Sequence, residues 1–214
     1  MYRTPSTRPQ TGFTLIELLV TIAVTSILMS VALPNLRDLV VGSQRDAMVN
    51  GLVGDLHHAR SESIKRAGRV AVCARKPGTG AICSEAAVPD WKNGWLVFLD
   101  EGPTVGRFEA TESGETLLRA SGPIAPSFRL ATSARVSGGV SVPSRRSFVR
   151  FGPRGTSNWR GGGTWLFCEQ GGEAAERDRR AVAINLSLSG DVRRARRDGA
   201  GNLINAFGTA SSCA

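Results

Sequence analysis

The sequence is poor in the residues that build most metal and catalytic sites. It contains only two histidines, His57 and His58, and its cysteines include no Cys-x-x-Cys pair. Adjacent side chains on a helix point about 100° apart, so the two histidines cannot share a metal ion on one helical face. The chain also lacks a Gly-x-Ser-x-Gly motif, a phosphate-binding loop and a spacing that singles out two catalytic acids. We therefore expect no metal, no cofactor and no enzymatic activity.

Lysine is scarce beside arginine, and acidic residues are missing from a long stretch of the chain. The net charge is +9. Residues 85–115 are rich in acids, whereas residues 119–160 carry eight arginines and no acid. A chain this basic favours an anionic partner, and the acid-free stretch predicts an electropositive face. A solvated surface that binds nothing is the alternative interpretation of such a stretch.

Long apolar runs are absent with one exception, Phe13–Leu33. As a helix at 1.5 Å per residue this run extends about 31 Å, which is enough to cross a bilayer core of roughly 30 Å. Its one ionisable residue is Glu17. A charge inside hydrocarbon costs a few kcal/mol, so Glu17 predicts a functional group that has a partner. Residues 1–12 carry Arg3 and Arg8 but no acid, which favours a cytoplasmic N-terminus.

The segment Gly12-Phe13-Thr14-Leu15-Ile16-Glu17 resembles the processing site of type IV prepilins and pseudopilins. A secretory signal places its small residues after the apolar stretch, whereas Gly12 precedes it. The resemblance implies that a prepilin peptidase removes residues 1–12 and that Phe13 becomes N-methylated. It also implies that Glu17 packs against other pilins, where it can neutralise a neighbour's Phe13 ammonium. The alternative is a monomeric signal anchor in which Glu17 stays protonated.

The pattern after the apolar run predicts a longer helix followed by strands. Pro34 matches the helix-kinking proline of the family. Residues 13–34 would form the transmembrane segment. Residues 35–68 would continue the helix in the periplasm and end at a cap formed by Gly68. The apolar stripe expected on this continuation is Leu36, Val40, Ala47, Met48, Leu52, Leu56, Ala59 and Ser63. The strands expected from a period of two are Arg69–Ala74, Trp95–Asp100, Thr116–Ala120, Phe128–Ala131, Ser147–Phe151, Thr164–Glu169, Ala181–Leu188 and Asp191–Ala195.

This order of elements indicates an α+β protein in which residues 69–214 form an antiparallel β domain packed against the helix. Two segments, Ala59–Ile64 and Trp91–Asp100, resemble the corresponding stretches of FimT and GspH proteins. The resemblance implies the pilin-like fold. Four cysteines allow three pairings. Proximity and the habit of the family favour Cys73 with Cys83 and Cys168 with Cys213, in an exported domain.

Two late segments carry the residues that we expect to contact an anionic partner. In DNA-binding FimT proteins the corresponding element resembles Gly-Arg-x-Arg; Gly190 and Arg193 match it, while Asp191 stands in place of the first arginine. Strand alternation would place Arg194 and Arg196 on one face and Arg193 and Arg197 on the other. The second segment is a Gly-rich loop with Arg154, Trp159 and Arg160, in which Trp159 either contacts DNA or packs against the sheet.

The leading functional hypothesis is a FimT-like minor pilin of a type IV pilus, which binds extracellular DNA for uptake in natural transformation or supports pilus assembly. Its DNA contacts would be non-specific, because phosphate contacts carry no sequence information. The alternative is a GspH-like structural pseudopilin of a type II secretion system. In either case the protein would sit in the inner membrane as a single-pass protein with a periplasmic C-terminal domain, and would then enter a pilus or pseudopilus.

Overall fold

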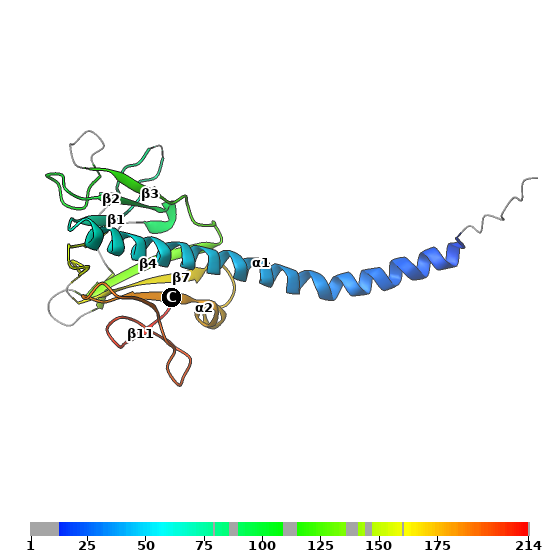
Figure 1. The fold of residues 1–214 in the computed structure, drawn as a ribbon. Coiled ribbons are helices and arrows are strands. Elements are labelled where there is room, and N and C mark those ends of the chain that lie inside the picture. Colours follow the sequence, from blue (N-terminus) through cyan, green and yellow to red (C-terminus); the bar gives the residue numbers. More distant parts are fainter. Residues whose placement is uncertain are drawn as a thin grey trace, which may run out of the picture. The chain divides into compact units, whose positions relative to one another are not determined.

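The computed structural model describes residues 13–78, 80–85, 90–108, 115–135, 141–143, 147–159 and 161–213. Gly12 and Arg160, both expected at functional positions, lie outside the described residues. The chain divides into two compact units, Met1–Ser43 and Gln44–Ala214. The long helix α1 (Leu15–Lys65) contributes residues to both units (Figure 1).

The part of α1 in the first unit has the properties of a membrane helix. Every large apolar side chain from Phe13 to Leu33 is more than half exposed. The hydroxyls of Thr21, Thr25, Ser26 and Ser30 each donate to a carbonyl three or four residues earlier, so they need no outside partner. Among the described residues α1 is the one helix long and apolar enough to cross a membrane. Lipid or other helices must cover such a surface.

In the second unit α1 buries a stripe of small and aliphatic side chains. The stripe consists of Val49, Leu52, Leu56, Ala59 and Ser63, spaced three and four residues apart. Leu52, Leu56, Ala59 and Ser63 were expected from the sequence, but Val49 was not. The expected residues before them are not buried: Ala47 is exposed, Met48 is half-buried, and Leu36 and Val40 are 58% and 49% exposed.

The expected cap at Gly68 is displaced by one residue. The left-handed position is Ala67, with φ of 48°. The Ala67 N–H donates to the Ile64 carbonyl, and the Gly68 N–H donates to the Ser63 carbonyl at 3.1 Å. This is the Schellman pattern, in which the residue after the left-handed one closes the longer bond. Gly68 therefore completes the cap without adopting the left-handed conformation itself.

Two antiparallel sheets contain most of the strands described after α1 (Figure 1). The four-stranded sheet has the order β3 (Leu117–Ala120), β2 (Trp95–Leu99), β1 (Val70–Ala74) and β6 (Phe148–Phe151). The five-stranded sheet has the order β5 (Ser141–Pro143), β4 (Phe128–Arg135), β7 (Gly163–Glu169), β8 (Val182–Leu186) and β9 (Val192–Arg194). All the expected strands are present, which confirms the α+β class and the antiparallel domain.

Several short elements were not expected. They are the 3-10 turn η1 (Trp91–Asn93), strand β5, helix α2 (Ala174–Arg180) and the hairpin of β10 (Leu203–Ile204) and β11 (Ala210–Ser211). The hairpin and the end of the chain cover the outer face of the five-stranded sheet, where they form a small apolar cluster. The buried members of that cluster are Leu166, Cys168, Ala181, Ala183, Leu203 and Cys213.

Polar contacts hold α1 to both sheets. On the side of the four-stranded sheet, the Asp55 carboxylate accepts from the Trp95 indole at 2.8 Å and from Arg119 at 3.0 Å. On the side of the five-stranded sheet, Arg194 donates to the Asn50 side chain at 3.1 Å. Residues 44–65 of α1 are therefore bound to both sheets.

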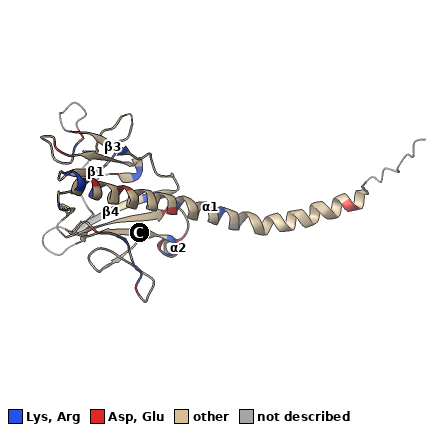
Figure 2. Cartoon of the chain, viewed as in Figure 1, with Lys and Arg blue, Asp and Glu red and all other residues tan. Residues whose placement is uncertain are grey.

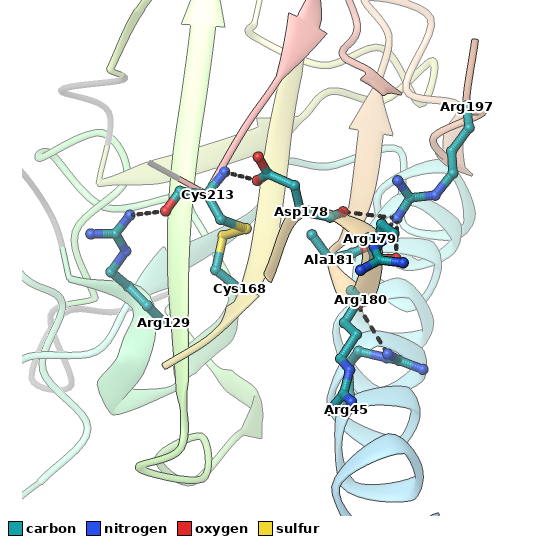
Figure 3. Close-up of a disulfide and its surroundings, with 9 residues drawn as sticks. All are labelled: Arg45, Arg129, Cys168, Asp178, Arg179, Arg180, Ala181, Arg197 and Cys213. Carbon is teal, nitrogen blue, oxygen red and sulfur yellow. Dashed lines mark hydrogen bonds between the residues drawn. A yellow bond between two sulfur atoms is a disulfide. The ribbon is translucent and has the colours of Figure 1, made fainter. Parts of the chain in front are cut away.

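The disulfides are Cys73–Cys83 and Cys168–Cys213, which confirms the expected pairing. The first bond joins β1 to the loop that follows it. The second joins β7 to the end of the chain, which is held twice more (Figure 3). The Cys213 N–H donates to the Asp178 carboxylate at 2.5 Å, and Arg129 donates to the Cys213 carbonyl at 3.4 Å.

Candidate nucleic-acid interface and assembly segment

The first candidate site is the start of α1, where Phe13 and Glu17 lie. Thr14 is the residue before the helix, and its hydroxyl accepts from the Glu17 N–H at 3.3 Å. Glu17 is the only charged residue of α1 before Arg37, as the colouring in Figure 2 shows. Within the described residues its exposed carboxylate has no partner. The first turn of a helix favours a negative charge, so this position suits an ionised carboxylate that can pair with a cation from another chain.

The second candidate site surrounds the turn between β8 and β9. The Gly190 N–H donates to the Ser187 carbonyl at 3.0 Å, and the Ser187 N–H donates to the Asp191 carbonyl at 2.9 Å. Gly190 has φ of 77°, and a Cβ atom at this position would overlap the carbonyl oxygen of Gly155. Glycine is therefore required by the turn itself, which gives Gly190 a structural role beside the DNA contact expected of it.

The end of α1 and two turns meet at this place. Arg60 donates to the Ser189 carbonyl at 3.0 Å, and the Ser157 N–H donates to the Leu188 carbonyl at 2.9 Å. These bonds bring the turn that carries Arg154 beside the turn that carries Gly190. No local pattern pointed to Arg60, because the residue that it contacts lies 129 positions away along the chain.

Both arginines of β9 lie close to carboxylates of the protein. Arg193 forms an ion pair with Asp191. Arg194 lies 3.7 Å from the Asp46 carboxylate of α1 and also donates to Asn50. β9 ends at Arg194, so the expected alternation of faces applies only to Arg193 and Arg194 and not to the arginines that follow. The pairing of Asp191 with Arg193 could have been predicted, because residues two apart in an extended chain share a face.

The Arg197 guanidinium makes its hydrogen bonds to backbone carbonyls of the protein, which does not fit its expected role at a DNA surface. It donates to the carbonyls of Asp178, Arg179 and Ala181 at 3.1, 2.8 and 2.8 Å (Figure 3). It also donates to the Gly201 carbonyl at 2.6 Å. The last carbonyls of a helix have no partner within it, so Arg197 caps the C-terminal end of α2. Arg45 of α1 donates to another carbonyl at this end of α2, that of Arg180, at 2.9 Å.

The loop after Arg197 is tightly bonded as well. The Asp198 carboxylate accepts from the Asn202 side chain and from the N–H groups of Ala200 and Asn202. The hydrogen bond from the Asn202 side chain, more than the backbone bonds, lowers the pKa of Asp198 below its usual value. The carboxylate is thereby kept ionised directly after Arg196 and Arg197 in the chain.

Arg154 and Arg196 are the expected contact residues that the fold leaves free. Both are exposed, and neither has a side-chain partner within the described part of the chain. Arg196 lines a groove of about 580 Å³ together with Arg193, Arg194 and Asp191. The other walls of the groove are the β8–β9 turn, Gly161–Gly162 and the segment Ile204–Ala206. An extended anionic group would find three guanidinium groups and one carboxylate here.

The expectation that Trp159 contacts DNA is wrong. Its side chain is 1% exposed, and its indole N–H donates to the Phe148 carbonyl at 3.0 Å. A Cβ atom on Gly163 would overlap the Trp159 ring, so that glycine makes room for it. The alternative interpretation, in which Trp159 packs against the sheet, is correct.

Arginines in the acid-free stretch also serve the fold. Arg119 pairs with Asp55, and Arg150 lies 3.2 Å from the fully buried side chain of Asp100. Asp100 in turn accepts from the Gly106 N–H at 2.9 Å and fixes the loop after β2. An excess of arginine along the sequence is thus a poor measure of an electropositive face in this protein.

Two family models match the chain. The model of the type II transport protein GspH matches residues 48–190, and that of the prokaryotic N-terminal methylation motif matches residues 7–33. The chain therefore belongs to the GspH family and carries the methylation motif. Together these findings imply processing by a prepilin peptidase, membrane anchoring through the apolar helix and assembly with other pilins.

Solved structures with a similar fold include two crystal forms of the type IV minor pilin FimU from Pseudomonas aeruginosa strain PAO1. The form in space group P21 is 15% identical over 80% of this chain and 96% of its own, with a TM-score of 0.49. The form in space group P65 is 15% identical over 79% of this chain and 99% of its own, with a TM-score of 0.47. No curated protein matches the chain.

Proposed function

We propose that this protein is a structural subunit of a type IV pilus-like fibre, inserted first in the inner membrane through residues 13–34. Residues 35–68 continue the helix into the periplasm, where residues 69–214 form the globular domain. The observation that carries this proposal is the exposed apolar helix with a single carboxylate, Glu17, that has no partner within the described residues. After removal of residues 1–12, a neighbour's Phe13 ammonium is its natural counter-ion, and pairing removes both charges from lipid.

The contacts of the arginines favour the GspH-like form of this role, a pseudopilin of a type II secretion system. Arg194 is tied to α1, and Arg197 caps α2. With Trp159 in the core and Gly190 required by its turn, four of the seven described residues that were expected to bind DNA support the fold.

Glu17 variants test the assembly role. Glu17→Ala should reach the membrane normally and fail to enter fibres, because the neighbour's ammonium is left unpaired. Glu17→Asp keeps the carboxylate and is the matched control. Immunoblots of sheared fibres and of the membrane fraction separate assembly from insertion. Equal amounts of Glu17→Ala and unmodified protein in the fibres would remove this function for Glu17.

A second candidate function is the FimT-like one, non-specific binding of extracellular DNA for uptake in natural transformation. The observation that favours it is the exposure of Arg154, Arg193 and Arg196 near the β8–β9 turn. Phosphate contacts of this kind release counterions, so the affinity should fall linearly in log salt, with a slope of about −0.9 per phosphate on duplex DNA.

The DNA role is tested with the full chain in detergent and duplex DNA at two salt concentrations. The triple variant Arg154→Gln, Arg193→Gln, Arg196→Gln should lose most of the binding. The matched control replaces Arg69, Arg107 and Arg179, which changes the net charge equally at positions outside the groove. If both triple variants bind DNA alike and the mutant strains transform alike, the chain has no DNA site at these arginines.

A further inference from the structure

Asp191 is a carboxylate in a wall of the groove that otherwise presents arginines. Its backbone is fixed on both sides: the Asp191 N–H donates to the Ser187 hydroxyl at 3.1 Å, and its carbonyl accepts from the Ser187 N–H. Because the turn holds Asp191 two residues before Arg193, the ion pair between them forms without any rearrangement of the backbone.

This ion pair changes what the groove can offer an anion. The Arg193 side chain is 77% exposed, so it is accessible to a ligand, but its guanidinium already has a carboxylate partner. Arg194 is similarly engaged with Asp46 and Asn50. Within the described residues, Arg196 is the one groove arginine without a side-chain partner. The groove is thus rich in arginine and poor in unpaired positive charge.

We propose that Asp191 determines the affinity of this groove for polyanions. It competes with phosphate for Arg193 and places a negative charge where a phosphate would bind, so it selects against nucleic acid. This inference rests on the DNA binding put forward above as the second candidate function. A phosphate that binds Arg193 must displace a carboxylate held beside it at high local concentration, and it is also repelled by that carboxylate.

The test uses the full chain in detergent and a short duplex DNA of mixed sequence. Asp191→Asn keeps the size of the side chain and removes its charge. We expect this variant to bind DNA up to about five-fold more tightly at low salt, since an exposed ion pair is rarely worth more. We also expect the slope of log affinity against log salt to steepen by about 0.9, the value for one additional phosphate contact.

Two further variants show whether the gain in DNA affinity arises at Arg193 or from the change in net charge. Glu85→Gln changes the net charge equally and releases Arg107 from an ion pair of 2.8 Å outside the groove, so it is the matched control. The double variant Asp191→Asn, Arg193→Gln should return to the affinity of the unmodified protein. The inference is wrong if Asp191→Asn binds no better than Glu85→Gln, or if the double variant keeps the gain.

The same measurement distinguishes failure of this inference from failure of the DNA function. If the unmodified protein shows no binding and Asp191→Asn binds, the natural chain is not a DNA-binding subunit and Asp191 is the reason. If the unmodified protein and Asp191→Asn bind equally, DNA binding stands and the role of Asp191 is refuted. If neither binds at low salt, both proposals fail.

Discussion

The indole of Trp159 stacks on that of Trp165, with ring centroids 4.6 Å apart and an interplanar angle of 22°. Trp165 also meets Trp91 edge to face, with centroids 5.6 Å apart. All three side chains are buried. A tryptophan in a glycine-rich segment, which resembles a ligand-binding loop in the sequence, is thus part of the aromatic core.

Replacing this indole should destabilise the domain. Trp159→Ala removes a buried ring and its stacking contact with Trp165, and changes of this kind cost about 3 to 5 kcal/mol. Leu188→Ala, at a side chain that is half exposed, is the control and should cost much less. Chemical unfolding of the full chain in detergent, followed by tryptophan fluorescence and circular dichroism, measures the difference. Equal stability of the two variants would contradict the assignment of Trp159 to the core.

Arg196 and Arg197 are neighbours that should respond oppositely to the same substitution. Arg197→Gln removes a charged donor from the carbonyls at the end of α2 and should lower the free energy of unfolding by about 1 to 3 kcal/mol. Arg196→Gln should stay within about 0.5 kcal/mol of the unmodified protein, because its side chain has no partner in the described structure. The same unfolding assay compares them. A loss as large in Arg196→Gln would show that the capping role is misassigned.

Alanine substitutions at Gly190 and Gly201 distinguish two ways in which an added side chain can lower the free energy of unfolding. Both have positive φ, 77° and 85°, but a Cβ atom overlaps Gly155 at Gly190 and meets nothing within 4 Å at Gly201. Gly201→Ala should cost about 1 to 2 kcal/mol from its left-handed conformation alone. Gly190→Ala should cost clearly more, because the clash is with backbone that cannot move aside. If thermal unfolding finds the two variants equal, the close packing of the turns around Gly190 is not required.

Processing should depend on Gly12. Protein purified from its native membranes should begin at Phe13, and Gly12→Asp should accumulate as the full-length precursor, since the peptidase expected for this motif cuts after a small residue. Intact-mass analysis of both proteins measures the N-terminus directly. A mature chain that starts at any other residue would be incompatible with the proposed assembly through Phe13 and Glu17.

Much of the architecture was predictable because it depends on short-range patterns. The apolar run Phe13–Leu33 identifies the exposed helix by its length alone. Strands such as β1, β2 and β7 were found with errors of about one residue because each is a short run of mostly apolar residues, many of them β-branched or aromatic. The cysteine pairing followed from proximity and family habit. Helix α2 was not predicted, because its seven residues include no buried apolar side chain and therefore show no apolar stripe.

The role of each arginine was decided by the tertiary structure. Arg193, Arg196 and Arg197 belong to one short basic run, and only the pairing of Arg193 with Asp191 has a local signal, their spacing of two residues. The fold gives Arg193 a carboxylate, leaves Arg196 without a partner and places Arg197 against the end of a helix near residue 180. A guanidinium binds whichever acceptor the fold brings to it, and these acceptors are up to 19 residues away along the chain. The sequence by itself determined the long apolar helix, the strands and the methylation motif, and only the tertiary packing determined which charges remain available to a partner.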